Sequence, residues 1–216
     1  MTKLNKITGD MFLILALIRN GKIVQIIHLI YPAKNRDMAS KRFAVFCGSK
    51  SGADPLFEQQ AFELGKQMAL HDIALIYGGG NKGLMGAVAD AMMANGGEVI
   101  GVIPELLLEW EHGHQGITEL RVVPDMHIRK KMMYELCDAA VVLPGGNGTL
   151  DELFEMLTWN TLKIHDKKIV LLNSNGFYNH LIAHIDNMFQ QGFLYEAWRE
   201  RLIVCNGPGD VISCLV

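Results

Sequence analysis

The sequence lacks several features that mark common protein classes. No hydrophobic run is long enough to span a bilayer, because the polar residues 19–22 (RNGK) separate the two apolar stretches near the N-terminus. No small-residue cleavage site of the signal-peptide type is present. The four cysteines show no CxxC spacing, and we interpret them as reduced thiols. We therefore expect a cytoplasmic protein that does not enter a membrane.

Strong charge of one sign and a triphosphate-binding motif are also missing. The net charge of −3 and the pI of about 6.2 provide no basic footprint, so nucleic acid is not an expected partner. A Walker A loop is absent, and with it the lysine that cradles the phosphates in a nucleoside triphosphatase. His114, His127 and His165 have no metal-ligand spacing, so we expect no metal and no cofactor.

The N-terminal residues do not share the pattern of the rest of the chain. Two short apolar runs, at residues 11–17 and 23–31, precede a charged linker, and the first convincing core strand begins at Phe43. We expect residues 1–41 to be an extension outside the core and residues 42–216 to form a single domain.

The position of Met38, just before the first core strand, suggests an origin for this extension. We hypothesise that residues 1–37 are loosely attached and reflect the choice of translation start. The alternative is an added hairpin or helix that packs on an apolar surface. The mass of the protein expressed from its native gene separates the two, because an N-terminus at Met1 would exclude the start-site hypothesis.

From Phe43 onward, short apolar segments alternate with helical segments of roughly a dozen residues, which is typical of α/β proteins. The expected strands are residues 43–47, 73–77, 98–103, 119–123, 138–143, 168–172 and 202–205. The expected helices are residues 55–71, 84–95, 126–136, 149–163, 178–191 and 210–215, and residues 104–116 are expected to form a long loop. The pattern predicts a Rossmann-like, doubly wound parallel sheet that binds ligands at the carboxyl ends of its strands.

The stretch LPGGNGTLDE, residues 143–152, joins an expected strand to an expected helix through a glycine turn. Glycine lets backbone N–H groups approach a ligand closely, and the N-terminus of a helix adds a partial positive charge, so the turn suits a phosphate. We expect Glu152 to lie in the first helical turn, facing the group that carries the phosphate. Similar loops follow two other strands, and from them we expect Ser49, Gly79 and Gly80 to contact the ligand.

Two of these motifs also fit other interpretations. Gly78-x-Gly80-x-x-Gly83 fits a dinucleotide fingerprint, but the only candidate for its acidic partner is Glu105, which sits beyond Pro104, so we disfavour NAD. Thr149 and Glu152 also match a capping box, which leaves a cap and a catalyst both open.

Arg129 and Lys130 admit two interpretations as well. They match an ordinary solvated basic face. However, they begin an expected helix, where cations oppose the helix dipole, and this conflict favours an anionic ligand.

Three motifs resemble the Lonely Guy (LOG) family of cytokinin riboside 5′-monophosphate phosphoribohydrolases, often mislabelled lysine decarboxylases. They are residues 78–91 (GGGNKGLMGAVADA), 126–130 (MHIRK) and 144–152 (PGGNGTLDE). The resemblance covers about residues 43–210, and the PGGxGTxxE motif with MHxRK upstream is specific. Asp151 and Lys50 replace the more usual Glu and Ser, and residues 1–42 have no counterpart.

The resemblance implies hydrolysis of the N-glycosidic bond of an adenosine 5′-monophosphate, with or without an N6 modification, by a homodimer that needs no cofactor. It assigns catalysis to Arg129 and Glu152. It assigns substrate contacts to Glu111, Arg129, Lys130, Gly146, Asn147, Gly148, Thr149, Leu150, Asp151, Glu152 and Thr158. Lysine decarboxylation would need a pyridoxal phosphate Schiff-base lysine, and no lysine here has a recognisable context for one.

Two alternatives come from other functional classes. A nucleotide or cofactor carrier resembling molybdenum-cofactor carriers would keep the phosphate loops but would not need Arg129 and Glu152. A relative of DNA-processing Rossmann proteins would need a basic groove, which the acidic balance disfavours. The choice between adenine and an N6-prenylated base, and between hormone production and nucleotide salvage, stays open.

Overall fold

The computed structural model describes residues 14–19, 22–28, 41–108 and 113–216. It divides the chain into two units, Met1–Met38 and Ala39–Val216. In the first unit, β1 (Ile14–Arg19) and β2 (Lys22–His28) pair as an antiparallel hairpin. A hairpin was one of the two alternatives for this region, and the start-site hypothesis stays a prediction.

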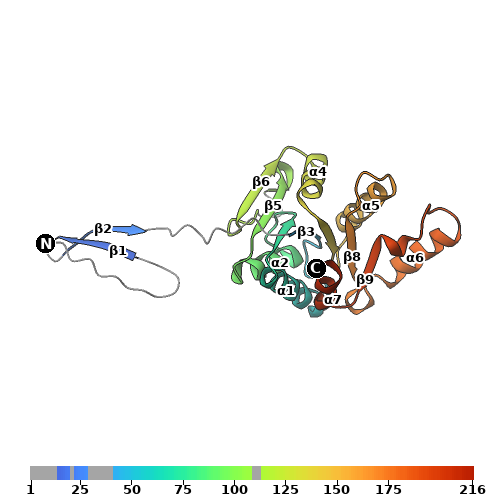
Figure 1. The fold of residues 1–216 in the computed structure, drawn as a ribbon, viewed down its shortest axis with the longest axis horizontal. Helices are drawn as coiled ribbons and strands as arrows, with labels where there is room; N and C mark the ends of the chain where they lie inside the picture. Colours follow the sequence, from blue (N-terminus) through green and yellow to red (C-terminus); the bar gives the residue numbers. More distant parts are fainter. Residues whose placement is uncertain (1–13, 20–21, 29–40, 109–112) are drawn as a thin grey trace. The chain divides into compact units, whose positions relative to one another are not determined.

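The second unit is built on one sheet of seven parallel strands (Figure 1). In chain order these are β3 (Lys41–Phe46), β4 (Ile73–Tyr77), β5 (Val99–Pro104), β6 (Glu119–Val123), β7 (Ala139–Val142), β8 (Lys168–Leu172) and β9 (Leu202–Cys205). Their order in space is β6-β5-β4-β3-β7-β8-β9. The chain runs outward from β3 to one edge and then returns to β7 and runs to the other. The predicted doubly wound parallel sheet is confirmed.

Helices cover both faces of this sheet (Figure 1). One face carries α1 (Pro55–Leu70), α2 (Gly83–Ala94) and α7 (Pro208–Leu215), and the other carries α4 (Met126–Leu136), α5 (Asn147–Thr161) and α6 (Asn179–Gln190). In β3, Phe43 and Val45 pack on the first face, while Ala44 and Phe46 pack on the second. Burial on both faces explains why a central strand such as β4 is a continuous apolar run, whereas the edge strand β6 is partly exposed and contains charged residues.

Local sequence signals explain where the helices begin. Asp54 accepts a hydrogen bond from the backbone N–H of Leu56 at 2.9 Å, and Pro55 is the first residue of α1. Asp125 accepts one from the N–H of Ile128 at 2.8 Å and so caps α4. The cap on α4 fixes the helical turn that carries Arg129.

The structure corrects the sequence prediction in two places that bear on the site, and the other elements differ from their predicted bounds by at most two residues. The expected loop 104–116 contains a short helix, α3 (Glu105–Leu108), because β5 continues through Pro104 and the chain turns directly into it. Helix α5 begins at Asn147 rather than at residue 149, with Gly146 as its N-cap residue. Two short 3₁₀ segments, Ser174–Gly176 and Trp198–Glu200, complete the described elements.

The chain reverses its direction of winding between β3 and β7, and this point positions the site. Ligands of doubly wound sheets bind in the crevice at such a switch point, outside the carboxyl ends of the strands. Gly48 follows β3 and Pro144 follows β7, and the N–H of Gly48 donates to the carbonyl of Pro144 at 3.0 Å. The two loops are therefore joined directly at the switch point.

Candidate active site

The turn between β7 and α5 is exposed and leads directly into the first turn of α5. Gly146, Asn147 and Gly148 are exposed, and no side chain caps the helix. The first N–H groups of any α-helix have no acceptor within the helix. A Cβ atom added to Gly146 or Gly148 would meet nothing within 4 Å. The fold itself therefore does not require glycine at these two positions, and open space lies beside them.

The capping-box interpretation of Thr149 and Glu152 is wrong. Because α5 begins at Asn147, Thr149 is its third residue and Glu152 its sixth, so Glu152 lies in the second turn rather than the first. Thr149 is buried, and its hydroxyl would lie 2.1 Å from a Cβ at Gly145. Thr149 therefore packs beneath the glycine turn instead of capping the helix.

Glu152 faces Arg129 across the space between α5 and α4. Arg129 Nη1 lies 3.3 Å from Glu152 Oε1, and each side chain is only 9% exposed. The Nε of Arg129 also donates to the carbonyl of Val102, at 3.1 Å, which fixes the guanidinium over the end of β5. A buried ion pair with a second hydrogen bond is held in one geometry and is costly to break. The interpretation of Arg129 as part of a solvated face is wrong.

Lys130 is engaged by two carboxylates of α5. Its Nζ lies 3.0 Å from Asp151 Oδ2 and 3.2 Å from Glu155 Oε1, and its side chain is largely buried. Burial acts to lower the pKa of Lys130, but hydrogen bonds to the two carboxylates outweigh it and raise that pKa. Lys130 thus ties α4 to α5 beside the Arg129–Glu152 pair.

The loop after β3 forms a cleft with the glycine turn. The N–H of Leu84 donates to the carbonyl of Gly48 at 3.1 Å, which brings the start of α2 to the same place. The cleft has a volume of about 380 Å³, and its lining includes Ser49, Lys50, Phe57, Leu84, Gly145 and Phe177. The predicted convergence of three glycine loops on one sheet edge is confirmed.

Two of the expected ligand contacts are covered by the chain itself. Gly79 and Gly80 are buried. The carbonyl of Gly79 accepts from the N–H of His114 at 2.9 Å, and Gly80 forms a β-bridge with Gly113. Glu111 lies outside the described residues.

The dinucleotide interpretation finds no support in the loop after β4. A Cβ at Gly78 would lie 2.2 Å from Nη2 of Arg129, so the guanidinium fills the space in front of this loop. Glu105 is exposed and begins α3 instead of ending β5.

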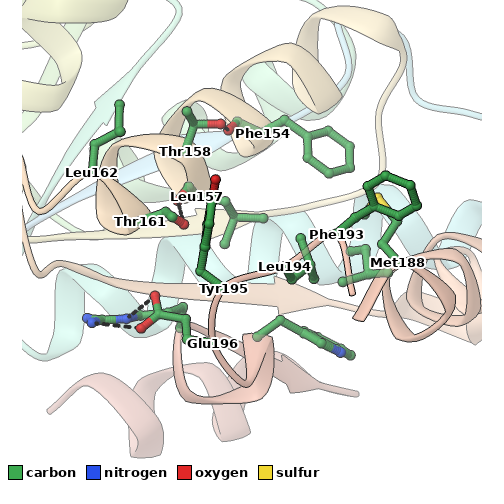
Figure 2. Close-up of a pocket in the computed structure, with 13 residues that line it drawn as sticks. Phe154, Leu157, Thr158, Thr161, Leu162, Met188, Phe193, Leu194, Tyr195 and Glu196 are labelled. Carbon is green, nitrogen blue, oxygen red and sulfur yellow. Dashed lines mark hydrogen bonds and ion pairs between the residues drawn. The ribbon is translucent and has the colours of Figure 1, made fainter. Parts of the chain in front are cut away.

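Thr158 lies on a different side of α5 from Glu152. Its hydroxyl donates to the carbonyl of Phe154 at 2.7 Å, as Figure 2 shows. Together with Leu157 it lines an apolar groove of about 340 Å³ whose other wall includes Ile185 and Met188 of α6. The structure does not bring Thr158 to the Arg129–Glu152 pair within one chain.

Sequence reasoning missed two residues that shape the site. Glu155 binds Lys130, and its spacing of four residues from Asp151 places both carboxylates on one helical face. That spacing was a readable signal. The contact of Gly78 with Arg129 had no local signal, because it joins segments far apart in the chain.

Two features are absent from the part of the chain that the structure describes. Among them, no helix has the length and apolar character needed to cross a membrane. Nor do three or more His, Cys, Asp or Glu side chains gather there as a metal site requires.

Comparisons with known proteins agree with the motifs. A family model described as "Possible lysine decarboxylase" matches residues 85–215. A cytokinin riboside 5′-monophosphate phosphoribohydrolase of Rhodococcoides fascians is 46% identical over 176 residues, which cover 81% of this chain and 89% of that protein. An enzyme of the same name from Arabidopsis thaliana is 46% identical over 175 residues, 81% of each chain.

A solved structure is similar in fold alone. The molybdenum cofactor binding protein of the phototrophic bacterium Rippkaea orientalis aligns with a TM-score of 0.62 at 21% identity, covering 81% of this chain and 94% of that chain.

Proposed function

The chain belongs to the family of cytokinin riboside 5′-monophosphate phosphoribohydrolases, and we propose that it hydrolyses the N-glycosidic bond of adenosine 5′-monophosphate or its N6-modified derivatives. Water enters the reaction, and the products are the free base and ribose 5-phosphate. The observation that carries the proposal is the buried Arg129–Glu152 pair beside an exposed glycine turn at a helix N-terminus.

The glycine turn suits the 5′-phosphate of the substrate. Residues 146–148 are exposed, the first N–H groups of a helix have no acceptor within it, and the positive end of the α5 dipole adds to their attraction for an anion. Asn147 and Asp151 flank this turn on exposed positions, and Leu150 is half-buried behind it. We assign the phosphate to this turn, with Ser49 on the opposite wall of the cleft.

Arg129 and Glu152 suit the chemistry at the sugar. Cleavage of an N-glycosidic bond develops oxocarbenium charge on the ribose, which a carboxylate stabilises while it orients or deprotonates water. Glu152 takes this role. Arg129, whose planar guanidinium has several fixed donors, orients the anionic substrate and offsets the carboxylate charge.

The lysine decarboxylase description does not suit this site. Decarboxylation of lysine depends on pyridoxal phosphate held by a lysine as a Schiff base. Lys130, the lysine beside the Arg129–Glu152 pair, is protonated and bound to Asp151 and Glu155, so it is not available as that nucleophile.

The test is release of free base from AMP and from isopentenyladenosine monophosphate, separated by chromatography. We expect release from the wild type and a fall in kcat of about 10²–10⁴ in Glu152→Gln, the range typical of a lost general acid or base. Glu135→Gln, an exposed glutamate of α4, serves as the matched control and keeps wild-type activity.

Two results would overturn the proposal. Full activity in Glu152→Gln would remove its carboxylate from the mechanism. Tight binding of the monophosphates without base release from the wild type would favour a carrier. The relative rates on the two substrates decide whether the base is adenine or its prenylated form.

The assembly and location remain part of the proposal. A homodimer is supported by the exposed apolar side chains of Leu162, Phe193 and Tyr195, which border the groove beside Thr158. In such a dimer Thr158 would lie at the interface between the two chains, where it could contact the substrate of the second chain. No disulfide joins the four cysteines, all of which lie in the described part of the chain, and this supports a cytoplasmic location. We assign the hydrolase domain to residues 42–216.

A further inference from the structure

The carbonyl groups at the end of β7 need hydrogen-bond donors from outside the turn. The carbonyl of Pro144 accepts from the N–H of Gly48 at 3.0 Å. On the β8 side of β7, the backbone N–H of Asn173 donates to the carbonyl of Cys205 in β9, at 2.8 Å, and not to β7. The carbonyl of Leu143 accepts instead from the side-chain hydroxyl of Tyr178, at 2.7 Å. One side chain therefore completes the support of the turn on the β8 side.

Tyr178 is itself held in place from several directions. Its side chain is buried, and its backbone N–H donates to Oδ1 of Asn173 at 2.7 Å. Nδ2 of Asn173 in turn donates to Asn179, at 2.8 Å. The neighbouring Phe177 ring, whose centroid lies 4.7 Å from that of Tyr178, lines the cleft beside the glycine turn. Tyr178 thus links the corner after β8 to the turn after β7.

The Tyr178 hydroxyl keeps its proton and can therefore always act as a hydrogen-bond donor. Burial and the nearby Cys47 thiol raise the pKa of Tyr178, and a hydrogen bond from the backbone N–H of Gly145 lowers it by less. The hydroxyl therefore stays protonated at neutral pH. It donates to the carbonyl of Leu143, directly before Pro144, at 2.7 Å.

We propose that Tyr178 is a positioning residue that holds the glycine turn so that the N–H groups of residues 146–148 point at the substrate phosphate. The inference rests on the proposed function, since it concerns the same phosphate. With Gly48 and Tyr178 holding its carbonyl groups inward, the turn leaves its following N–H groups for a ligand. The hydroxyl does not touch the substrate and acts through the backbone.

The test removes only the hydroxyl, with the variant Tyr178→Phe. We expect KM for the nucleotide monophosphate to rise about fivefold, the equivalent of one ordinary hydrogen bond, while kcat stays within about twofold. The inhibition constant of ribose 5-phosphate rises by the same factor. Tyr134→Phe, which removes a buried tyrosine hydroxyl of α4 for which the structure gives no hydrogen bond, is the matched control and changes neither constant.

A merely structural role gives a different result. Loss of folded enzyme lowers kcat and leaves KM unchanged, and that pattern, or no change at all, would overturn the proposal. If Tyr178→Phe does not fold, Asn173→Ala removes the acceptor that fixes the Tyr178 backbone and is expected to raise KM in the same direction.

Failure of the proposed function is recognised separately. If the wild type releases no base, calorimetric titration with AMP still measures how tightly the protein binds the nucleotide. About fivefold weaker binding in Tyr178→Phe than in the wild type supports the positioning role, and equal affinity would overturn it.

Discussion

The two glycine turns on either side of β3, at residues 78–83 and 145–148, contain similar sequences but differ in why they contain glycine. In the first, the protein's own atoms occupy the space that a side chain would need: Arg129 in front of Gly78 and the backbone of Lys50 against Gly83. In the second, Gly146 and Gly148 face open space. Glycine in the first turn therefore serves packing, as Gly145 does against Thr149, whereas Gly146 and Gly148 leave room for a ligand.

This difference explains why the dinucleotide fingerprint was misleading here. The G-x-G-x-x-G spacing indicates only that the backbone comes close to something. In this protein that neighbour is the side chain of Arg129. The contacts of an added Cβ distinguish the two cases, and substitution by alanine makes the distinction measurable.

The largest effect is expected for Gly78→Ala. Its Cβ would lie 2.2 Å from Nη2 of Arg129 and 3.0 Å from the sulfur of Met85, so the guanidinium must move and its alignment with Glu152 is lost. We expect kcat/KM to fall about 100-fold, since a displacement of about 1 Å can have that effect. Gly209→Ala, whose Cβ would meet nothing within 4 Å, is the control in steady-state assays and should retain full activity. Wild-type activity in Gly78→Ala would mean that this turn is not built around Arg129.

A large loss of stability is expected for Gly83→Ala. Gly83 has a φ of +58°, and its Cβ would lie 2.4 Å from the backbone nitrogen of Lys50. Left-handed backbone costs about 1–2 kcal/mol and overpacking about 1–3 kcal/mol, so unfolding in urea should show a loss of about 2–5 kcal/mol. Gly192→Ala, with a φ of +77° and open space, isolates the backbone contribution. Equal losses in the two variants would show that the packing of Gly83 against the β3 loop contributes nothing.

The smallest effect on stability is expected for Gly148→Ala. Position 148 is the second residue of α5 and has open space around it, so alanine should stabilise the helix by about 0.5–1 kcal/mol. The same methyl group projects into the space assigned to the phosphate, and KM should rise. Thermal unfolding together with KM separates the two effects. A destabilised variant with unchanged KM would show that Gly148 serves packing, as the glycines of the first turn do, and does not leave room for the phosphate.

Much of the fold was predictable from local sequence. The strands at residues 73–77, 119–123, 168–172 and 202–205 have the predicted bounds. Three of them are mainly apolar runs between turn residues, whereas residues 119–123 include Glu119 and Arg121. The helix at residues 126–136 also matches, since Asp125 gives it a clear cap. The start of α5 was missed because its N-cap is Gly146, which offers no side-chain signal.

The candidate site was predictable in its parts but not in its arrangement. The motifs identify Arg129 and Glu152, yet their 3.3 Å pairing depends on how α4 and α5 pack on the sheet. Lys130 was expected at the substrate, and its binding to Asp151 and Glu155 emerges only in three dimensions. Tyr178 had no motif at all, because its role depends on a hydrogen bond to a residue 35 positions earlier.

The most direct test of this account compares AMP with adenosine, which lacks the phosphate, in the wild type and in Gly148→Ala. The measured quantity is the ratio of kcat/KM for the two substrates. If the turn at residues 145–148 holds the phosphate, the wild type strongly prefers AMP, and the variant reduces that preference by about tenfold or more, the equivalent of about 1.4 kcal/mol. An unchanged ratio in the variant would contradict the assignment of the phosphate to this turn.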